Sequence, residues 1–270
     1  MIHPNLYRKP VTLDTRAHAD LRVAPYGDDW SVASGMNSIA VAVAEFADLA
    51  TEFPLVFVQV GNAQGGTELM PVAVFGLTAG ENLYVEGKTW RANHLPLLLR
   101  MYPFGIAGVE GERVLLAIDE AWPGWSRTEG EPLFEAGQPT ERTTQMADQI
   151  GKVAGELRQG VEFARVLSDA GLLMETRFEA KSPDGQTIQV DGFFSVDAEK
   201  LAALNDNEVL SLWRSGAMAL VHAHQLSLRH MARLADWRLK RHQEQAQAQG
   251  AAASEAPAAA SAAPGAASAG

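Results

Sequence analysis

Residues 186–234 read QTIQVDGFFSVDAEKLAALNDNEVLSLWRSGAMALVHAHQLSLRHMARL, and this stretch carries the strand and helix signals that decide the fold. Ile188 and Val190 alternate with polar neighbours, which predicts a half-buried strand. Gly192 then interrupts the alternation just before Phe193-Phe194. This interruption predicts a bend or bulge that carries two large apolar side chains into a core.

The second part of the stretch predicts a helix. Asn205 is a good N-cap residue, and Glu208 follows it by three positions, as in a capping box. Apolar and small residues then recur at spacings of three and four, which predicts one long helix from about 205 to 234 with one face buried against a sheet. The residues of that face are Val209, Trp213, Gly216, Leu220, Ala223, Ser227, His230 and Leu234.

Outside this stretch, the chain alternates between short apolar runs and turns. The runs before the acidic loop at 119–140 predict hairpins of antiparallel strands, and two further strands flank a turn at 182–185. A second long helix is expected over about 140–170, because apolar residues step by four and three from Met146 to Leu167. The fold class is therefore α+β: an antiparallel β-sheet meander packed with two long C-terminal helices. The expected strands before the acidic loop are 11–13, 21–23, 55–60, 69–76, 82–86, 104–109 and 113–118.

The composition changes near the C-terminus. From Gln243 onward the residues are mainly Gln, Ala, Ser, Pro and Gly, which lack the large apolar groups needed to offset chain entropy. We therefore expect one α+β domain over 1–242 and a low-complexity tail over 243–270 that is disordered past about residue 250. Basic residues gather just before this tail, where they complement the negative end of a helix dipole. They are Arg229, Arg233, Arg238, Lys240 and Arg241.

Charge and composition exclude several classes of protein. The net charge of −11 argues against a nucleic-acid-binding protein, which needs a basic surface. The chain has no cysteine, so disulfides, thiolate metal sites and a cysteine nucleophile are excluded. No stretch approaches the ~18 apolar residues of a transmembrane helix, and the N-terminal residues contain no apolar signal-peptide core. We therefore expect a cytoplasmic protein.

Candidate functional residues are polar or aromatic side chains near the acidic loop and on the second helix. Asp119 and Glu120 follow an apolar strand, and Asp191 and two histidines, His222 and His224, lie in the opening stretch. Carboxylates with a histidine suit acid–base chemistry, but solvated charges and a histidine that caps a core contact are the commoner arrangement. The two histidines differ by about 200° around a helix, so one helix cannot turn both to one metal ion. No metal or cofactor is predicted.

Two tryptophans complete the candidate ligand-binding set. Trp90 and Trp122 are of the residue type that lines clefts for sugars or apolar ligands, although such residues are more often core anchors. The glycine-rich segment at 61–66 is neither a dinucleotide-binding nor a Walker sequence, because no Lys-Ser/Thr follows it.

Several short motifs in a fixed order resemble the SapC family of bacterial proteins, over about residues 5–235. No single motif is decisive, and the order and spacing carry the resemblance. The motifs are His18-Ala-Asp20-Leu21-Arg22-Val23, Glu45-Phe46, Glu52-Phe53-Pro54-Leu55-Val56-Phe57, Pro71-Val72-Ala73, Gly76-Leu77, Gly80-Glu81-Asn82-Leu83, Tyr102-Pro103-Phe104, Ile118-Asp119-Glu120, Gly130-Glu131-Pro132-Leu133-Phe134, Asp191-Gly192-Phe193 and Leu220-Val221-His222-Ala223-His224.

This resemblance implies a bacterial protein associated with the surface layer, with no catalytic residue set to transfer. The first hypothesis is thus a non-enzymatic protein, cytosolic or peripherally attached, that binds a protein or peptide partner in surface-layer or secretion-related interactions. The alternative is a cytosolic small-molecule-binding protein or enzyme, with a pocket between the acidic loop and the helix that carries His222 and His224. The oligomeric state is left open by the sequence.

Overall fold

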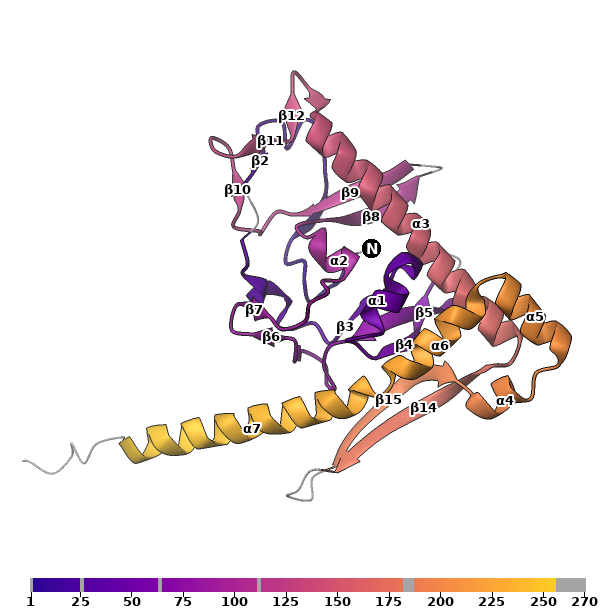
Figure 1. Ribbon diagram of the computed structural model, residues 1–270. Coiled ribbons are helices and arrows are strands. Elements are labelled where there is room, and N and C mark those ends of the chain that lie inside the picture. Colours follow the sequence, from indigo (N-terminus) through magenta and orange to yellow (C-terminus); the bar gives the residue numbers. More distant parts are fainter. Residues whose placement is uncertain (1, 25–26, 63–64, 111–112, 182–186, 256–270) are drawn as a thin grey trace, which may run out of the picture.

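A computed structural model describes residues 2–24, 27–62, 65–110, 113–181 and 187–255 (Figure 1). It confirms a mixed α+β fold with antiparallel sheets. The expected disordered tail falls mostly on 256–270, outside the described residues. Residues 251–255 are helical, so regular structure extends past the residue where we expected it to end.

The main sheet has five strands in the order β14-β15-β4-β5-β3, with every neighbouring pair antiparallel. The apolar run at 55–60 and the returning run after the glycine-rich turn form its central hairpin, as predicted. A run of apolar residues suits this position, because Leu55, Val56 and Phe57 are all buried and both faces of β4 are therefore covered at this end. The strands are β3 (Ser38–Ala40), β4 (Leu55–Gly61), β5 (Thr67–Val74), β14 (Leu173–Lys181) and β15 (Thr187–Val196).

A second sheet contains β1 (Pro10–Thr12), β9 (Arg113–Asp119) and β8 (Phe104–Glu110), in that order. The strands before the acidic loop therefore do not form one continuous meander, although the predicted hairpins of 55–60 with 69–76 and of 104–109 with 113–118 are both present. Residues 75–103 turn away from the first sheet through a small hairpin and the short helix α2 (Leu97–Arg100), so the strands on either side never become neighbours.

The remaining strands are each two residues long. The predicted arm at 82–86 yields only the last two residues as a strand, which pairs with β7. Strand β2 lies between two strands of the acidic loop, so the N-terminal segment and this loop form one small sheet. The short strands are β2 (Arg22–Val23), β6 (Val85–Glu86), β7 (Thr89–Trp90), β10 (Trp125–Ser126), β11 (Glu131–Pro132), β12 (Phe134–Glu135) and β13 (Gln138–Pro139).

Helix α3 (Glu141–Asp169) is the first predicted long helix. The Thr140 hydroxyl accepts a hydrogen bond from the Thr143 N–H and caps its start. At its end, the Leu172 N–H donates to the Leu167 carbonyl and the Gly171 N–H to the Ser168 carbonyl, which is the Schellman arrangement. The predicted seam is buried from Ile150 to Leu167, while Met146 is half-buried.

The second predicted long helix is in fact three helices, because the chain leaves helical geometry at Ser215-Gly216 and again at Leu228-Arg229. At the first break Gly216 has a φ of 78°, a left-handed conformation that glycine adopts without strain. The predicted start is confirmed: Asn205 caps α5, and the Glu208 carboxylate accepts a hydrogen bond from the Asn205 N–H. The helices are α5 (Asp206–Arg214), α6 (Ala217–Ser227) and α7 (His230–Glu255), preceded by the short α4 (Ala198–Ala202).

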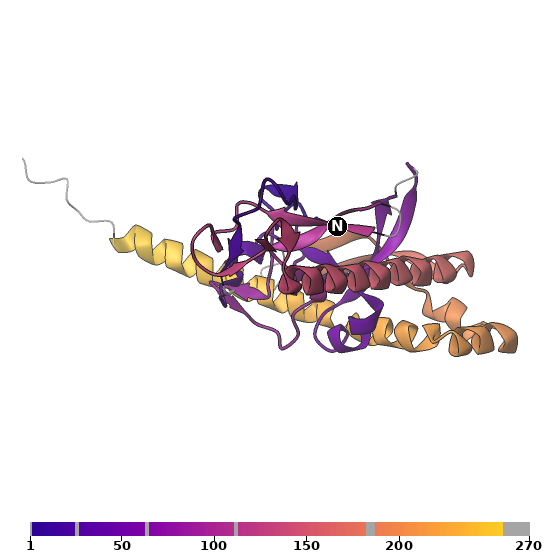
Figure 2. The ribbon, with the colours of Figure 1, turned by 90° about the horizontal axis from the view of Figure 1, so that it is seen from above.

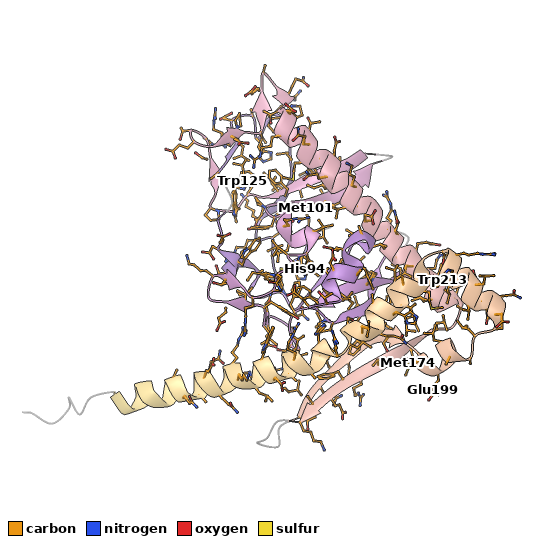
Figure 3. The ribbon with its side chains drawn as sticks, in the orientation of Figure 1. His94, Met101, Trp125, Met174, Glu199 and Trp213 are labelled. Carbon is orange, nitrogen blue, oxygen red and sulfur yellow. The ribbon has the colours of Figure 1, made fainter. Side chains whose placement is uncertain are left out.

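The break also changes which side chains are buried. Leu212, Ala217 and Val221 face the core, whereas the predicted Val209 and Trp213 are exposed, Trp213 by 72% (Figure 3). The left-handed residue rotates α5 relative to α6, so side chains spaced by three and four residues across it do not lie on one face. Counting through Gly216 therefore predicted the wrong buried face for α5. Beyond the break, Ser227, His230 and Leu234 are buried as predicted.

Helices α3 and α6 cover the same face of the five-stranded sheet (Figure 2). The Phe57 ring in β4 contacts Phe163 of α3 and His224 of α6, with ring centroids 5.8 Å and 5.2 Å apart. The 3-10 turn Val43–Glu45 and the short helix α1 (Phe46–Leu49) pack beside α3 and α6, whereas the 3-10 turn Trp30–Ala33 packs against β6 and β7. No helix in the described ranges has the length and apolar character needed to cross a bilayer.

The bulge predicted at Gly192 is present in β15. Thr176 is opposite Phe193 and Phe178 is opposite Val190, so Asp191 and Gly192 together face one residue of β14. Phe193 is buried and Phe194 is half-buried, in agreement with the expected role of the bulge.

Candidate functional site

A groove of about 800 Å³ runs between α3 and the β1-β9 side of the second sheet. Its sheet wall includes Leu13, Leu115 and Leu116, and Leu115 remains 37% exposed. A concave surface with apolar walls and a few polar groups is the usual form of a binding site. The lining residues are Thr12, Leu13, Thr15, Leu115, Leu116, Phe134, Pro139, Thr143, Thr144, Ala147, Asp148, Gly151 and Lys152.

The helical wall of this groove is built from small side chains. Ala147 and Gly151 lie one turn apart on α3, and a Cβ atom added at Gly151 would meet nothing within 4 Å. The groove therefore exists because the side chains of α3 at Ala147 and Gly151 fill little volume. We call it the α3 groove.

The polar groups of the α3 groove come from four threonines and from Asp148 and Lys152. The Thr143 hydroxyl donates to the Leu133 carbonyl, and the Thr144 hydroxyl donates to the Thr140 carbonyl, so both are satisfied within the chain. The hydroxyls of Thr12 and Thr15 make no hydrogen bond to the described residues. Asp148 and Lys152, one turn apart and exposed, put both signs of charge at the rim.

The predicted site residue Asp119 is completely buried at the end of β9. Its carboxylate accepts hydrogen bonds from the Arg8 N–H (3.0 Å), the Lys9 N–H (2.8 Å), the Ala121 N–H (3.2 Å) and the Tyr102 hydroxyl (2.9 Å). Four donors satisfy the usual acceptor sites of a carboxylate. Asp119 thus fastens the N-terminal segment to β9.

Glu120 faces the other way and is accessible. Its carboxylate pairs with the Lys9 ammonium at 2.7 Å and with His18 Nε2 at 3.4 Å. The hydrogen bond from Lys9, followed by that from His18, lowers the pKa of Glu120, so this carboxylate is ionised at neutral pH. Because the group is exposed, we attach little stability to these contacts.

Trp122 lies near both carboxylates and lines a cavity of about 470 Å³. Its ring packs edge-on against Trp125 with a centroid separation of 5.0 Å, and the Trp125 indole donates to the Asp119 carbonyl. Arg8 and Tyr102 contribute to the same cavity. Three of the seven predicted residues, Asp119, Glu120 and Trp122, are therefore neighbours.

His224 is a buried core residue on α6. Its Nδ1 lies 2.8 Å from the Leu55 carbonyl, which can only accept, and its Nε2 lies 3.1 Å from the Val196 N–H, which can only donate. The ring must therefore be neutral with its proton on Nδ1. Burial lowers the pKa of His224 to about 4, which agrees with this assignment. His222 is exposed on the same helix, next to Gln225 at 3.3 Å.

The other two predicted residues have structural partners of their own. Asp191 is exposed and pairs with Arg177 at 2.6 Å and Gln189 at 2.7 Å. The Trp90 indole donates to the His94 carbonyl at 2.8 Å, and its ring stacks on Tyr84 with a centroid separation of 5.8 Å.

The structure does not bring the predicted carboxylates and histidines together. Within the described ranges, no hydrogen bond or ion pair joins His222 or His224 to Asp119, Glu120 or Asp191. Nor does any group of three or more His, Cys, Asp and Glu side chains in the part of the chain that is described form a site for a metal ion. A ligand-binding role for the seven residues stays a prediction.

The α3 groove was missed because its signal is an absence of side-chain bulk. Ala147, Gly151 and Gly155 recur at spacings of four on α3. This small-residue row could have identified a helix face that leaves space, but the row alone does not reveal what lies opposite.

A family model for SapC matches residues 13–234, which is most of the chain and includes every strand of the two larger sheets except β1. This chain belongs to the SapC family. No curated protein and no solved structure matches it. The groove and the Asp119 cluster both lie in or beside the part of this SapC chain that the family model covers, apart from Arg8, Lys9 and Thr12.

Proposed function

We propose that this SapC protein is a non-enzymatic binding protein that holds a segment of a polypeptide partner in the α3 groove. The groove is the observation that carries the proposal. It follows α3 from Thr143 to Lys152, which is about 14 Å of helix at 1.5 Å per residue. That length suits about four residues of an extended chain at ~3.3 Å each.

The chemistry of the walls suits a polypeptide. Leu13, Leu115 and Leu116 offer apolar contacts to side chains, while Thr12 and Thr15 offer hydroxyls that can bond a backbone amide or carbonyl. The rim residues Asp148 and Lys152 present one charge of each sign, so the rim as a whole does not select a partner segment by its net charge.

The resemblance described for the sequence supports the kind of partner. We propose that it is a surface-layer or secreted polypeptide, bound by a cytosolic or peripherally attached SapC protein before or during its export. The alternative, a carboxylate and histidine pocket for a small molecule, has no supporting hydrogen bond between its proposed members.

The test fills the groove without disturbing the fold. Gly151→Trp places the largest side chain where an added Cβ meets no atom, and replacing a helical glycine favours the helix by up to about 1 kcal/mol. Gln149→Trp is the matched control, because Gln149 is exposed on the same helix about 200° away. Equal thermal midpoints of both variants and the parent would show that the fold is intact.

Tagged parent and variant proteins would be used to recover partners from their source cells. We expect parent and Gln149→Trp to retain the same exported polypeptide, and Gly151→Trp to lose at least about tenfold of it; purified partner would then be titrated against all three. Equal binding to Gly151→Trp would show that the groove is not the site. Recovery of bare protein in every case would count against a polypeptide-binding function.

A further inference from the structure

Among the described residues, strand β14 forms one edge of the five-stranded sheet and pairs with β15 alone (Figure 1). It is nine residues long and contains no proline or glycine. Its outer edge thus presents a row of backbone N–H and C=O groups, which is a template for another strand.

The edge is also regular. The irregularity between the two strands of this hairpin lies in β15, where Asp191 and Gly192 face Arg177 alone. Natural edge strands are commonly protected by a bulge or a proline within the edge strand itself. Neither feature occurs in β14, so its backbone keeps the geometry needed for pairing.

The charges along β14 alternate in sign on one exposed face. Glu175, Arg177, Glu179 and Lys181 are exposed, while Thr176, Phe178 and Ala180 between them are half-buried. Arg177 pairs with Asp191 within the chain, whereas Glu175, Glu179 and Lys181 have no ion-pair partner among the described residues.

We propose that β14 pairs antiparallel with β14 of a second copy of this chain, centred on Phe178. In this register Glu175 faces Lys181 of the other copy and Arg177 faces Glu179, so every charge on the exposed face meets its opposite. Two-fold symmetry makes each contact twice, as in other isologous interfaces. The two five-stranded sheets become one continuous sheet.

The register is specific because slippage reverses the electrostatics. A slip of two residues in one direction sets Glu175 against Glu179 and Arg177 against itself; in the other direction it sets Arg177 against Lys181 and Glu179 against itself. Like charges directly opposite each other destabilise a strand pair. A run of one sign would repel a second copy in every register, whereas this alternating run repels it in the registers shifted by two residues.

The dimer should be reversible. Pairing over 175–181 alone provides less contact than the roughly 1,000 Å² typical of a stable interface. Sedimentation equilibrium on the full chain should therefore give a mass that rises with concentration from 29.0 kDa towards twice that value. Added salt should raise the dissociation constant, because it screens exposed charge pairs.

Charge exchange tests the register. Lys181→Glu places a glutamate opposite Glu175 of the other copy, which gives two like-charged contacts in each dimer. This substitution should raise the dissociation constant at least about tenfold. Glu175→Lys combined with Lys181→Glu restores opposite charges and should restore dimerisation. Lys240→Glu, the same charge change at an exposed site on α7, is the control and should leave the constant unchanged.

The absence of native cysteine allows a direct second test. Glu175→Cys and Lys181→Cys proteins, mixed and oxidised, should form a disulfide-linked pair, because directly opposed residues have Cβ atoms about 4.5–5.5 Å apart. Neither protein alone should link efficiently. A chain that stays monomeric at all concentrations, a dimer indifferent to Lys181→Glu, or equal linking of a single variant alone would overturn the proposal.

Discussion

His224 makes the stability of this protein depend on pH. In the folded state its neutral ring bonds the Leu55 carbonyl and the Val196 N–H, and burial lowers its pKa to about 4. In the unfolded chain the pKa returns to about 6.5. Between these two values the unfolded chain binds a proton that the folded protein does not, so acidification favours unfolding.

The size of this effect follows from proton linkage. One extra proton on the unfolded state changes the free energy of unfolding by about 1.4 kcal/mol per pH unit. Over the window from about pH 6.5 down to about pH 4, His224 should therefore remove about 3 kcal/mol of stability. Above pH 6.5 both states are neutral and the contribution of His224 is constant.

Urea unfolding followed by tryptophan fluorescence, from pH 4.5 to 7.5, would measure this slope. His230 acts in the same sense, because burial lowers its pKa as well. The comparison is therefore between parent and His224→Gln, whose amide does not titrate. The parent should be steeper by about 1.4 kcal/mol per unit below pH 6.5. Equal slopes would refute the assignment of a neutral, buried ring.

Three further substitutions test other parts of the fold by urea unfolding at pH 7. Gly76→Ala should lower the free energy of unfolding by about 2 kcal/mol or more, because the new Cβ would lie 2.1 Å from the Glu81 carbonyl oxygen. The control is Gly61→Ala, whose Cβ meets no atom and which should change the free energy of unfolding little. Equal losses for the two variants would contradict this close approach. Asn205→Ala removes the cap of α5 and should cost about 1 kcal/mol, with a smaller helical circular-dichroism signal; an unchanged value would mean that the cap is not used. Asp119→Ala should cost about 3 kcal/mol, because it leaves buried donors of Arg8, Lys9 and Tyr102 unpaired; a cost below 1 kcal/mol would show that water replaces the carboxylate.

Local features of the fold were predictable where the physical cause is local. The central hairpin follows from two apolar runs around a glycine-rich turn, and the start of α5 from an N-cap residue followed by Glu208. The pairing of β15 with β4 was not predictable, because alternation identifies a strand without naming its neighbour. The break at Gly216 was missed because a single glycine is tolerated within many helices, and only the observed φ separates the two cases.

The candidate site shows the same division. Asp119 and His224 have the residue types of acid–base chemistry, yet each is held by backbone groups from distant segments, and no local pattern reports those partners. Leu115 and Gly151, by contrast, are ordinary in sequence and become a groove only because α3 lies against β9. Residue type alone therefore predicted a site at Asp119 and His224, whose side chains have structural roles, and gave no indication of the α3 groove.

The position of β4 between β5 and β15 has a consequence during synthesis on the ribosome. Strand β4 is complete once Gly61 has been added, and β5 covers one of its edges soon afterwards, but β15 is made only at residues 187–196. Throughout that interval the nascent chain exposes the apolar strand β4 with one edge unpaired. Prematurely terminated products that end before β15 should therefore aggregate, and the cell must shield the growing polypeptide until the last strand arrives.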